Sequence, residues 1–411
     1  MDTDIQKYLL DLRRERGSAF SPASDSSSSS QARCLGMGSV SASLRSLPLA
    51  KRLCRSLARE SGRRVLLVEL SSNLSPVRLS DCFCPQGFNG DFHFHDDVQE
   101  FGPSTFHLRL GMDAVPGEYG KWVSILRHFK AHYEFVVFCW DTDVDCTTLT
   151  GLIRCLDRTL LLVSAGQRGG LHCQFLWRQI RRCDPGAIDR LEPWVCLGAN
   201  QSIGEVRAEF ESRLRDFRLA ESGEQRIQFL TPRWIGWRLR SLARELTGRR
   251  VGLALSAGGA KGLAHIGVIQ VLEENGIEID VVAGCSMGAY VAAVWAYGHD
   301  GSEMERLARQ VEGRWGFLPL LDPVLPPREG FMRGDAIRRR LEQSIGDAHF
   351  ADLPRPLRVT ATRLDSLECV VFDQGRVAPM VHGSCAIPGV FVPVTIAGKT
   401  YVDGGISDRP H

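Results

Sequence analysis

Two strand–turn–helix units follow one another between Val251 and Tyr297, and this stretch constrains the fold more than any other. The apolar runs Val251–Leu255 and Ile279–Ala283 have the length and composition of buried strands. Each run ends in a glycine-bearing turn, and each turn opens a helical pattern. Strands that alternate with helices predict a parallel sheet, so we expect an α/β fold.

The second turn carries a candidate nucleophile. It reads Gly284-Cys285-Ser286-Met287-Gly288, a G-x-S-x-G pattern between a strand and a helix. Glycines flank the serine because larger side chains would collide in so tight a turn. The amide end of the following helix points at the serine and favours developing negative charge. The pattern therefore predicts a nucleophile elbow with Ser286 at its tip.

Two further segments complete the candidate site. The first turn offers backbone amides at a helix start, and it reads Gly258-Gly259-Ala260-Lys261-Gly262. Near the C-terminus, a carboxylate follows a strand in the sequence Tyr401-Val402-Asp403-Gly404-Gly405. A serine hydroxyl is a poor nucleophile without a base, and a partly desolvated carboxylate that reaches it can be that base. Only the fold can bring Ser286 and Asp403 together.

The composition limits the class of protein. The 411 residues are 44% apolar and 24% charged, which is typical of a globular protein of about two domains. A formal net charge of +2 gives no strong field, so nucleic acid is not an expected partner. The cysteines show no CxxC spacing, the N-terminus lacks a signal-peptide core, and no apolar run is long enough to span a membrane. We expect a cytoplasmic protein with reduced thiols, in at most peripheral contact with membranes.

The first half divides into a lead-in and an α/β domain. Residues 1–31 include a serine tract that cannot bury a core, and we expect them to be disordered. Between residues 32 and 231, apolar runs alternate with helical patterns, which predicts a parallel sheet. The expected strands are Arg64–Leu70, Glu134–Trp140, Thr159–Ser164 and Leu191–Leu197, and the expected helices are Leu44–Glu60 and Leu171–Arg182.

This half resembles the MinD/ParA-type P-loop ATPases in the segments Gly62–Asn73 and Phe135–Asp143. The phosphate loop should precede the Leu44 helix, where the chain has Gly36–Ser41 without the lysine that reaches the phosphates. The resemblance therefore implies a degenerate domain, and we expect no nucleotide and no cofactor. The segment His93–Asp97 partly matches a zinc pattern, but the ligand set is incomplete and we expect no metal.

Residues 232–249 predict a basic amphipathic linker helix between the two halves. Its leucines recur at helical spacing, two tryptophans precede them, and several arginines add charge. Such a helix can pack its apolar stripe on the next domain, which we favour, or it can lie at a membrane interface through its arginine face.

From about residue 245 to 410 the sequence resembles a patatin-like phospholipase domain, close to the neuropathy-target-esterase branch. The resemblance rests on the two glycine-bearing turns, the aspartate motif at Tyr401–Gly405 and the segment Ser384–Gly389. The resemblance implies an α/β/α hydrolase domain over residues 250–411 and a Ser–Asp dyad, with Ser286 as nucleophile and Asp403 as base. It also implies an oxyanion loop at Gly258–Gly262, and a phospholipid or lysophospholipid substrate met at a membrane surface.

Two departures from this family and one apolar loop need an explanation. The oxyanion turn usually begins with a third glycine, where this chain has Ala257. The chain ends at His411, shortly after Gly405, whereas family members usually continue, so we expect a trimmed or incomplete domain. The loop Phe317–Phe331, rich in Leu and Pro, is interpreted either as an apolar lip over an acyl-chain site or as an ordinary buried loop.

Other readings of the site stay open. A Ser–His–Asp triad of the α/β-hydrolase order would use Asp365 or Asp373 followed by His382. Another possibility is a catalytically silent, membrane-associated binding or scaffolding protein, and a protease or thioesterase is a third. The sequence itself does not distinguish headgroup, acyl position or calcium dependence.

Overall fold

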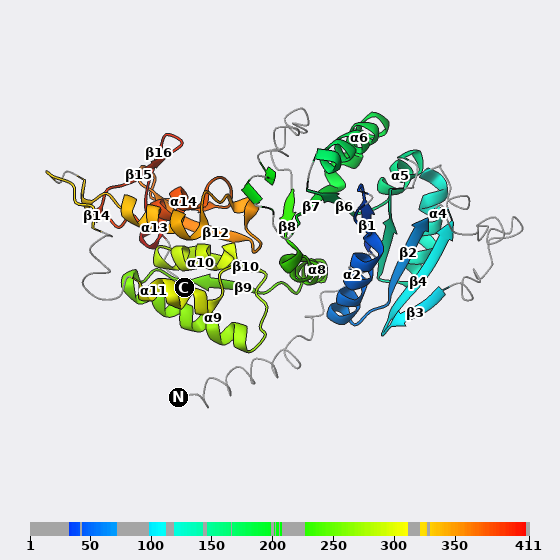
Figure 1. Cartoon of the computed structure of the whole chain (residues 1–411), viewed down its shortest axis with the longest axis horizontal. Coiled ribbons are helices and arrows are strands. Elements are labelled where there is room, and N and C mark those ends of the chain that lie inside the picture. Colours follow the sequence, from blue (N-terminus) through cyan, green and yellow to red (C-terminus); the bar gives the residue numbers. More distant parts are fainter. Residues whose placement is uncertain are drawn as a thin grey trace, which may run out of the picture.

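The computed structural model describes residues 33–41, 43–71, 98–111, 119–142, 146–165, 167–198, 201, 203–204, 206–207, 227–310, 321–326 and 329–407. Within these ranges the chain forms two large sheets, each with its own helices, and one small two-stranded sheet (Figure 1). The predicted α/β fold is confirmed. The expected serine-rich lead-in and the zinc-like segment His93–Asp97 lie outside the described residues.

The first sheet has the strand order β3-β4-β2-β5-β1-β6-β7-β8, and only β3 runs antiparallel to its neighbour. Its strands are β1 Arg33–Ser39, β2 Val65–Ser71, β3 Val98–Gly102, β4 Thr105–Gly111, β5 Phe135–Trp140, β6 Arg158–Ser164, β7 Leu191–Cys196 and β8 Gln228–Leu230. The helices that accompany it are α2 Ser46–Ser61, α4 Tyr119–His132, α5 Cys146–Ile153, α6 Gln167–Cys183, the 3₁₀ helix η3 Pro185–Arg190 and α8 Pro232–Leu246.

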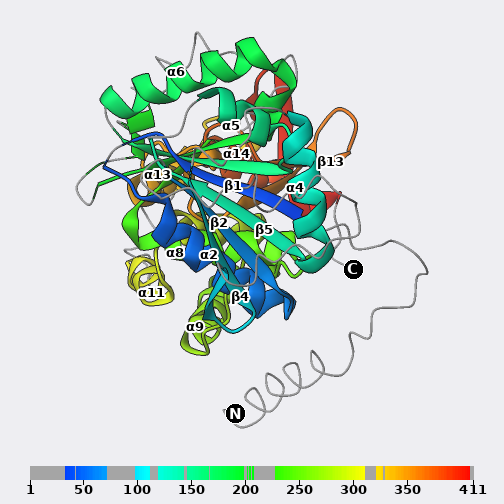
Figure 2. The same ribbon diagram turned by 90° about the vertical axis from the view of Figure 1, so that its right-hand side faces the viewer.

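The helices cover the first sheet on both faces, because its strands are apolar on both sides. Alternate residues of β2 contribute to two cores, Leu66 and Val68 to one and Val65 and Leu67 to the other. Helices α4, α5 and α6 pack on the first of these cores, and α2 and α8 pack on the second (Figure 2). The expected strands and helices of this half are therefore confirmed.

The phosphate-loop position differs from the expectation. Gly36 and Gly38 belong to strand β1 rather than to a loop. A Cβ on Gly38 would lie 2.2 Å from the Trp140 ring, so this glycine makes room for a tryptophan. At the start of α2, the backbone N–H of Ser46 donates to Asp141 Oδ1 at 2.9 Å. A carboxylate of the chain itself thus occupies the helix N-terminus, the kind of position that binds phosphate in P-loop proteins.

The second sheet has the order β15-β16-β12-β10-β9, with β13 also paired to β12. Strands β9, β10 and β12 are parallel, and β13 and β16 run antiparallel to β12. The strands are β9 Gly252–Leu255, β10 Val281–Cys285, β12 Leu357–Arg363, β13 Cys369–Phe372, β15 Val394–Ile396 and β16 Lys399–Asp403. The helices are α9 His265–Glu274, α10 Met287–Tyr297, α11 Gly301–Arg309, α13 Asp335–Ile345, α14 Val377–Ser384 and the 3₁₀ helices η5 Gly259–Ala264, η7 Phe350–Asp352 and η8 Gly404–Ile406.

One apolar run near the C-terminus forms two strands. The run Val390–Ile396 splits at Pro393 into β14 (Gly389–Phe391) and β15, which belong to different sheets. Proline has no backbone N–H and cannot continue a ladder. Strand β14 pairs instead with β11 (Gly330–Met332) in a two-stranded sheet.

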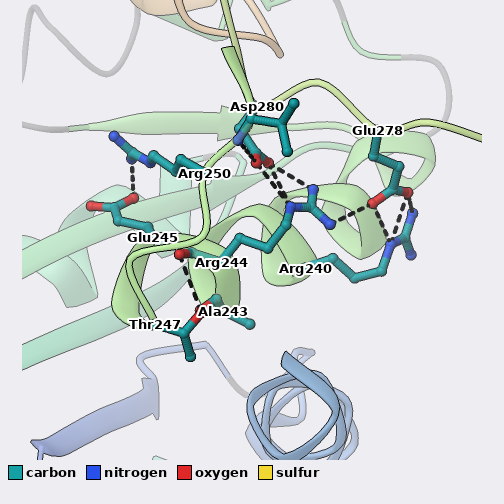
Figure 3. Close-up of polar contacts among 9 residues, drawn as sticks. Arg240, Ala243, Arg244, Glu245, Thr247, Arg250, Glu278 and Asp280 are labelled. Atoms are coloured by element: carbon teal, nitrogen blue, oxygen red, sulfur yellow. Dashed lines mark hydrogen bonds and ion pairs between the residues drawn. The ribbon is translucent and has the colours of Figure 1, made fainter. Parts of the chain in front are cut away.

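Helix α8 joins the halves, and the prediction about its packing is wrong in one respect. Its leucines pack on the second core of the first sheet, against α2, and not on the domain that follows. Its arginines bind that domain: Arg244 Nε and Nη2 donate to Asp280 at 2.6 to 3.0 Å, and Arg244 Nη1 lies 2.8 Å from Glu278 (Figure 3). Arg240 also binds Glu278. These two arginines are therefore engaged within the protein.

An aromatic contact strengthens the same junction. The Arg355 guanidinium lies 3.8 Å from the ring centre of Trp295 on α10, and 5.5 and 5.7 Å from those of Trp234 and Trp237 on α8. Burial lowers the pKa of Arg355 to about 10, so it remains charged at neutral pH and the stacking is of cation–π type. In addition, Arg207 pairs with Asp352 of η7 at 2.5 Å.

Candidate active site

A sharp turn with Ser286 at its tip forms where strand β10 meets helix α10. Ser286 has φ 53° and ψ −124°, a strained conformation for a residue with a side chain. Its hydroxyl does not cap the helix and instead donates to Asp403 Oδ2 at 2.5 Å. Both residues are buried. The structure therefore brings together the two residues that the sequence separates by most of the second half.

Asp403 is held in place by backbone and side-chain bonds. It ends β16, pairs with Ala361 of β12, and accepts a hydrogen bond at Oδ1 from the Gly405 N–H at 2.8 Å. Thr362 Oγ1 donates to its carbonyl oxygen at 2.9 Å. One carboxylate oxygen is thus fixed by the backbone, and the other faces the Ser286 hydroxyl. This arrangement suits a base with a defined orientation.

Ser384 is a positioning residue that the sequence reasoning did not identify. Its buried hydroxyl accepts from the Ser286 N–H at 2.8 Å and donates to the Thr360 carbonyl at 2.6 Å. It thereby ties the elbow to α14 and β12. In the sequence, Ser384 is marked only by the family resemblance of the segment Ser384–Gly389, and a serine at the end of a helix gives no further signal.

The glycine-rich turn lies beside the same cavity as Ser286. Gly259 and Ala260, in the first turn of η5, line the same cavity as Ser286, while Gly258 is not part of that lining. The first N–H groups of a helix have no partner within it, so these amides can bind a negatively charged oxygen. The side chain of Lys261 is exposed. Ala257 is not among the described residues with positive φ, so alanine is accommodated there without strain.

Other glycines of the motifs serve close packing around the elbow. Positions where a Cβ would come within 3.1 Å of a neighbour are Gly262 against Met287, Gly284 against Ala289, Gly404 against the Thr360 carbonyl, and Gly405 against Asp403. The tightest is Gly288, whose Cβ would lie 2.2 Å from the Leu255 carbonyl oxygen. Helix α10 therefore starts in direct backbone contact with the end of β9.

Replacing Gly288 by alanine is expected to destabilise the protein by about 1–3 kcal/mol, because the backbones of α10 and β9 must separate. The urea unfolding midpoint measures this effect. The matched control is Gly267→Ala in α9, where a Cβ meets nothing within 4 Å and alanine favours the helix. If both variants unfold at the same urea concentration, the close contact at Gly288 does not limit stability.

An apolar cavity of about 310 Å³ opens beside the serine. Its wall is formed mainly by aliphatic, methionine and aromatic side chains, among them Leu263, Val291, Val294, Met304, Leu307, Ile337 and Phe391. Polar groups in the lining are Ser286, Tyr290, Arg340 and Ser344. Burial raises the pKa of Tyr290 to about 12, so its hydroxyl is neutral. The cavity suits a hydrocarbon chain whose polar end lies at Ser286.

The residues of the alternative triad are not assembled. His382 Nε2 lies 3.2 Å from the Arg333 carbonyl oxygen, and burial lowers the imidazole pKa, so the ring is neutral at pH 7. Asp365 pairs with Arg363 and Asp373 with Arg358. His265 Nε2 lies 3.0 Å from the Ser256 carbonyl oxygen. Cys385 also lines the cavity, but burial raises the pKa of its thiol and keeps it un-ionised.

Within the part of the chain that the structure describes, no group of three or more His, Cys, Asp or Glu side chains is arranged to hold a metal ion. None of the described helices combines the length and hydropathy needed to cross a bilayer.

The second half of the chain is similar to a known protein family. Residues 253–410 match the patatin-like phospholipase family. The chain is 40% identical over 159 residues to an uncharacterized NTE family protein of Mycobacterium tuberculosis, a match that covers 39% of this chain and 43% of that protein. It is 33% identical over 169 residues to lysophospholipase NTE1 of Cryptococcus neoformans, covering 41% of this chain and 10% of that protein. The chain thus spans less than half the length of these relatives, and the predicted patatin-like resemblance is confirmed.

Solved structures similar to this chain include a ParA family ATPase from Chlorobium tepidum, at 18% identity and a TM-score of 0.35, covering 44% of this chain and 81% of that one. VipD from Legionella pneumophila matches at 22% identity and a TM-score of 0.32, covering 39% of this chain and 47% of that one.

Proposed function

We propose that this chain is a serine acyl hydrolase that cleaves fatty-acyl esters of phospholipids or lysophospholipids. The observation that carries the proposal is the 2.5 Å hydrogen bond from Ser286 Oγ to Asp403 Oδ2 beside an apolar cavity. The family match over residues 253–410 supports the same chemistry. A base in contact with the hydroxyl activates the nucleophile, and the cavity accommodates the acyl chain.

Acylation follows from this geometry. Ser286 Oγ attacks the ester carbonyl carbon while its proton passes to Asp403 Oδ2. The backbone amides of Gly259 and Ala260 stabilise the oxyanion of the tetrahedral intermediate. As the intermediate collapses, Asp403 returns the proton to the leaving glycerol oxygen. The fatty-acyl group is then bound to Ser286 as an ester.

Deacylation repeats the steps with water. Asp403 takes a proton from a water molecule that attacks the acyl-enzyme carbonyl, and the same amides stabilise the second oxyanion. Collapse releases the fatty acid and returns the proton to Ser286 Oγ. No cofactor is required by this scheme.

The first half, residues 32–231, is proposed to be a structural or regulatory domain that binds no nucleotide, with 232–249 as the linker to the hydrolase domain at 250–411. Two contacts support this. The Asp141 carboxylate accepts the Ser46 N–H at the start of α2, and the Trp140 ring packs against Gly38. The carboxylate takes the helix N-terminus at which a phosphate group would bind, and the tryptophan accounts for the glycine as a packing residue of the sheet. Equilibrium dialysis with radiolabelled ATP is expected to show no retention, and saturable binding would contradict the assignment.

A fluorophosphonate probe is expected to label the folded chain stoichiometrically at Ser286, as located by mass spectrometry of the peptides. Fatty-acid release from lysophosphatidylcholine tests the substrate class in parallel. We propose that the protein acts in the cytoplasm as a peripheral enzyme at membrane surfaces. If the folded protein is neither labelled nor active, the silent binding or scaffolding role is favoured instead.

A further inference from the structure

A small ribbon of the second half presents apolar side chains to solvent. We define the apolar ribbon as residues 321–326 with β11 (Gly330–Met332) and β14 (Gly389–Phe391). Strands β11 and β14 pair in parallel, with Met332 opposite Phe391, and Pro323 bridges to Met332. The Val324 N–H donates to the Phe331 carbonyl oxygen at 2.9 Å. Figure 1 places β14 at the end of the molecule away from the first sheet.

The two faces of the ribbon differ in what they contact. Met332 and Phe391 line the cavity that holds Ser286. Side chains alternate along a strand, so their neighbours Phe331 and Val390 point away from the cavity, and these are 67% and 38% exposed. Leu325 is 86% exposed. The ribbon is therefore apolar on its cavity side and on its solvent side.

Exposed apolar side chains are concentrated at the apolar ribbon. Of the twelve exposed large apolar side chains in the described residues, five lie on the ribbon or just before β14, namely Leu321, Leu325, Phe331, Ile387 and Val390. Ile387 also lines the cavity, so the exposed set is continuous with the cavity wall. Gathered apolar side chains on a surface mark a site of interaction, whereas scattered ones do not.

Charge next to the ribbon indicates the kind of partner. Arg333 directly follows β11, and its side chain is exposed. None of the ion pairs between described residues involves Arg333. Arginines at the border of an apolar surface bind lipid phosphates while the apolar side chains enter the acyl region. A protein partner would not need the apolar surface to continue into the cavity that holds the nucleophile.

We propose that the apolar ribbon inserts into the surface of a phospholipid membrane, with Leu325 and Phe331 in the acyl region and Arg333 at the phosphates. Insertion places the cavity wall at Ile387, Met332 and Phe391 next to lipid, so an acyl chain reaches Ser286 without crossing water. This inference rests on the proposed function, since it assigns to the same site the surface from which its substrate comes.

Vesicle flotation tests the proposal in the Ser286→Ala background, where the lipid stays intact. Vesicles of phosphatidylcholine with a minority of phosphatidylglycerol are the ligand. The added pair Leu325→Ser and Phe331→Ser is expected to weaken binding about tenfold or more, because two large apolar groups no longer leave water. The matched control pair is Leu367→Ser and Val371→Ser, which are 62% and 53% exposed and do not line the cavity. It should bind as the parent does.

Activity separates this proposal from the proposed function. With Ser286 intact, the ribbon pair should hydrolyse soluble p-nitrophenyl butyrate at the parental rate but release fatty acid from vesicles about tenfold more slowly. Parental vesicle binding by the ribbon pair would overturn the insertion proposal, even if hydrolysis depends on Ser286. A parent that hydrolyses neither substrate would overturn the proposed function, while its vesicle binding would still decide the role of the ribbon.

Discussion

Replacing Ser286 by alanine is expected to reduce fatty-acid release from lysophosphatidylcholine by about 10³-fold or more, because no other described hydroxyl is bonded to the carboxylate oxygens of Asp403. The fold should survive, since the change removes one hydroxyl and leaves the Ser286 N–H bond to Ser384 intact. Initial rates of fatty-acid release measure the loss, and far-ultraviolet circular dichroism with a urea titration measures the fold.

The base is tested alongside the nucleophile. Asp403→Asn keeps the shape and the Gly405 contact but cannot accept the hydroxyl proton, so a loss of about 10²–10⁴-fold is expected. Combining it with Ser286→Ala should cost little more than Ser286→Ala alone, because the two groups act as a unit. Asp365→Asn is the control, since that carboxylate pairs with Arg363. Unchanged hydrolysis in Ser286→Ala would remove this serine from the mechanism.

Asp280→Ala should have the largest effect on stability, about 3–5 kcal/mol, because it leaves the Arg244 guanidinium buried with only part of its pairing. The Asp280 side chain is fully buried and accepts from Arg244 and from the Val251 N–H. Urea unfolding followed by tryptophan fluorescence measures the loss, since Trp234 and Trp237 lie at the junction.

The control for Asp280 is Asp373→Ala, which removes the carboxylate of a more exposed pair with Arg358. Such pairs contribute little to stability, so the unfolding midpoint should hardly move. Equal midpoints for the two variants would mean that the junction ion pairs do not stabilise the protein.

Much of the fold could be predicted from patterns within short segments of the sequence. The strands of both sheets are short apolar runs between turn residues, and the elbow has a fixed spacing around Ser286. The strand β14 was not separable from β15 because apolar composition alone does not reveal which sheet a run joins, although Pro393 marks the break. Helix α8 was assigned to the wrong neighbour because an amphipathic pattern shows which face is apolar, but not what that face will meet.

Some residues of the candidate site were predictable from the sequence, and others were not. Ser286 and Asp403 stand in recognisable motifs, and a family resemblance relates them to one another. The contact of Ser384 with Ser286 was not predictable, because it is a hydrogen bond between segments that approach only in the folded chain. The cavity is likewise a property of packing, since its wall draws one or two side chains from each of several helices.

The salt bridges of α8 set a limit on where this protein can be divided. The family match begins at residue 253, but Asp280, which immediately precedes the strand leading to Ser286, is neutralised by an arginine at position 244. A hydrolase cut at the family boundary would carry a buried carboxylate without its counter-charge. The shortest fragment that we expect to fold as a hydrolase is therefore longer than the segment that matches the family. It includes α8, and the apolar face of α8 must then be buried against other residues.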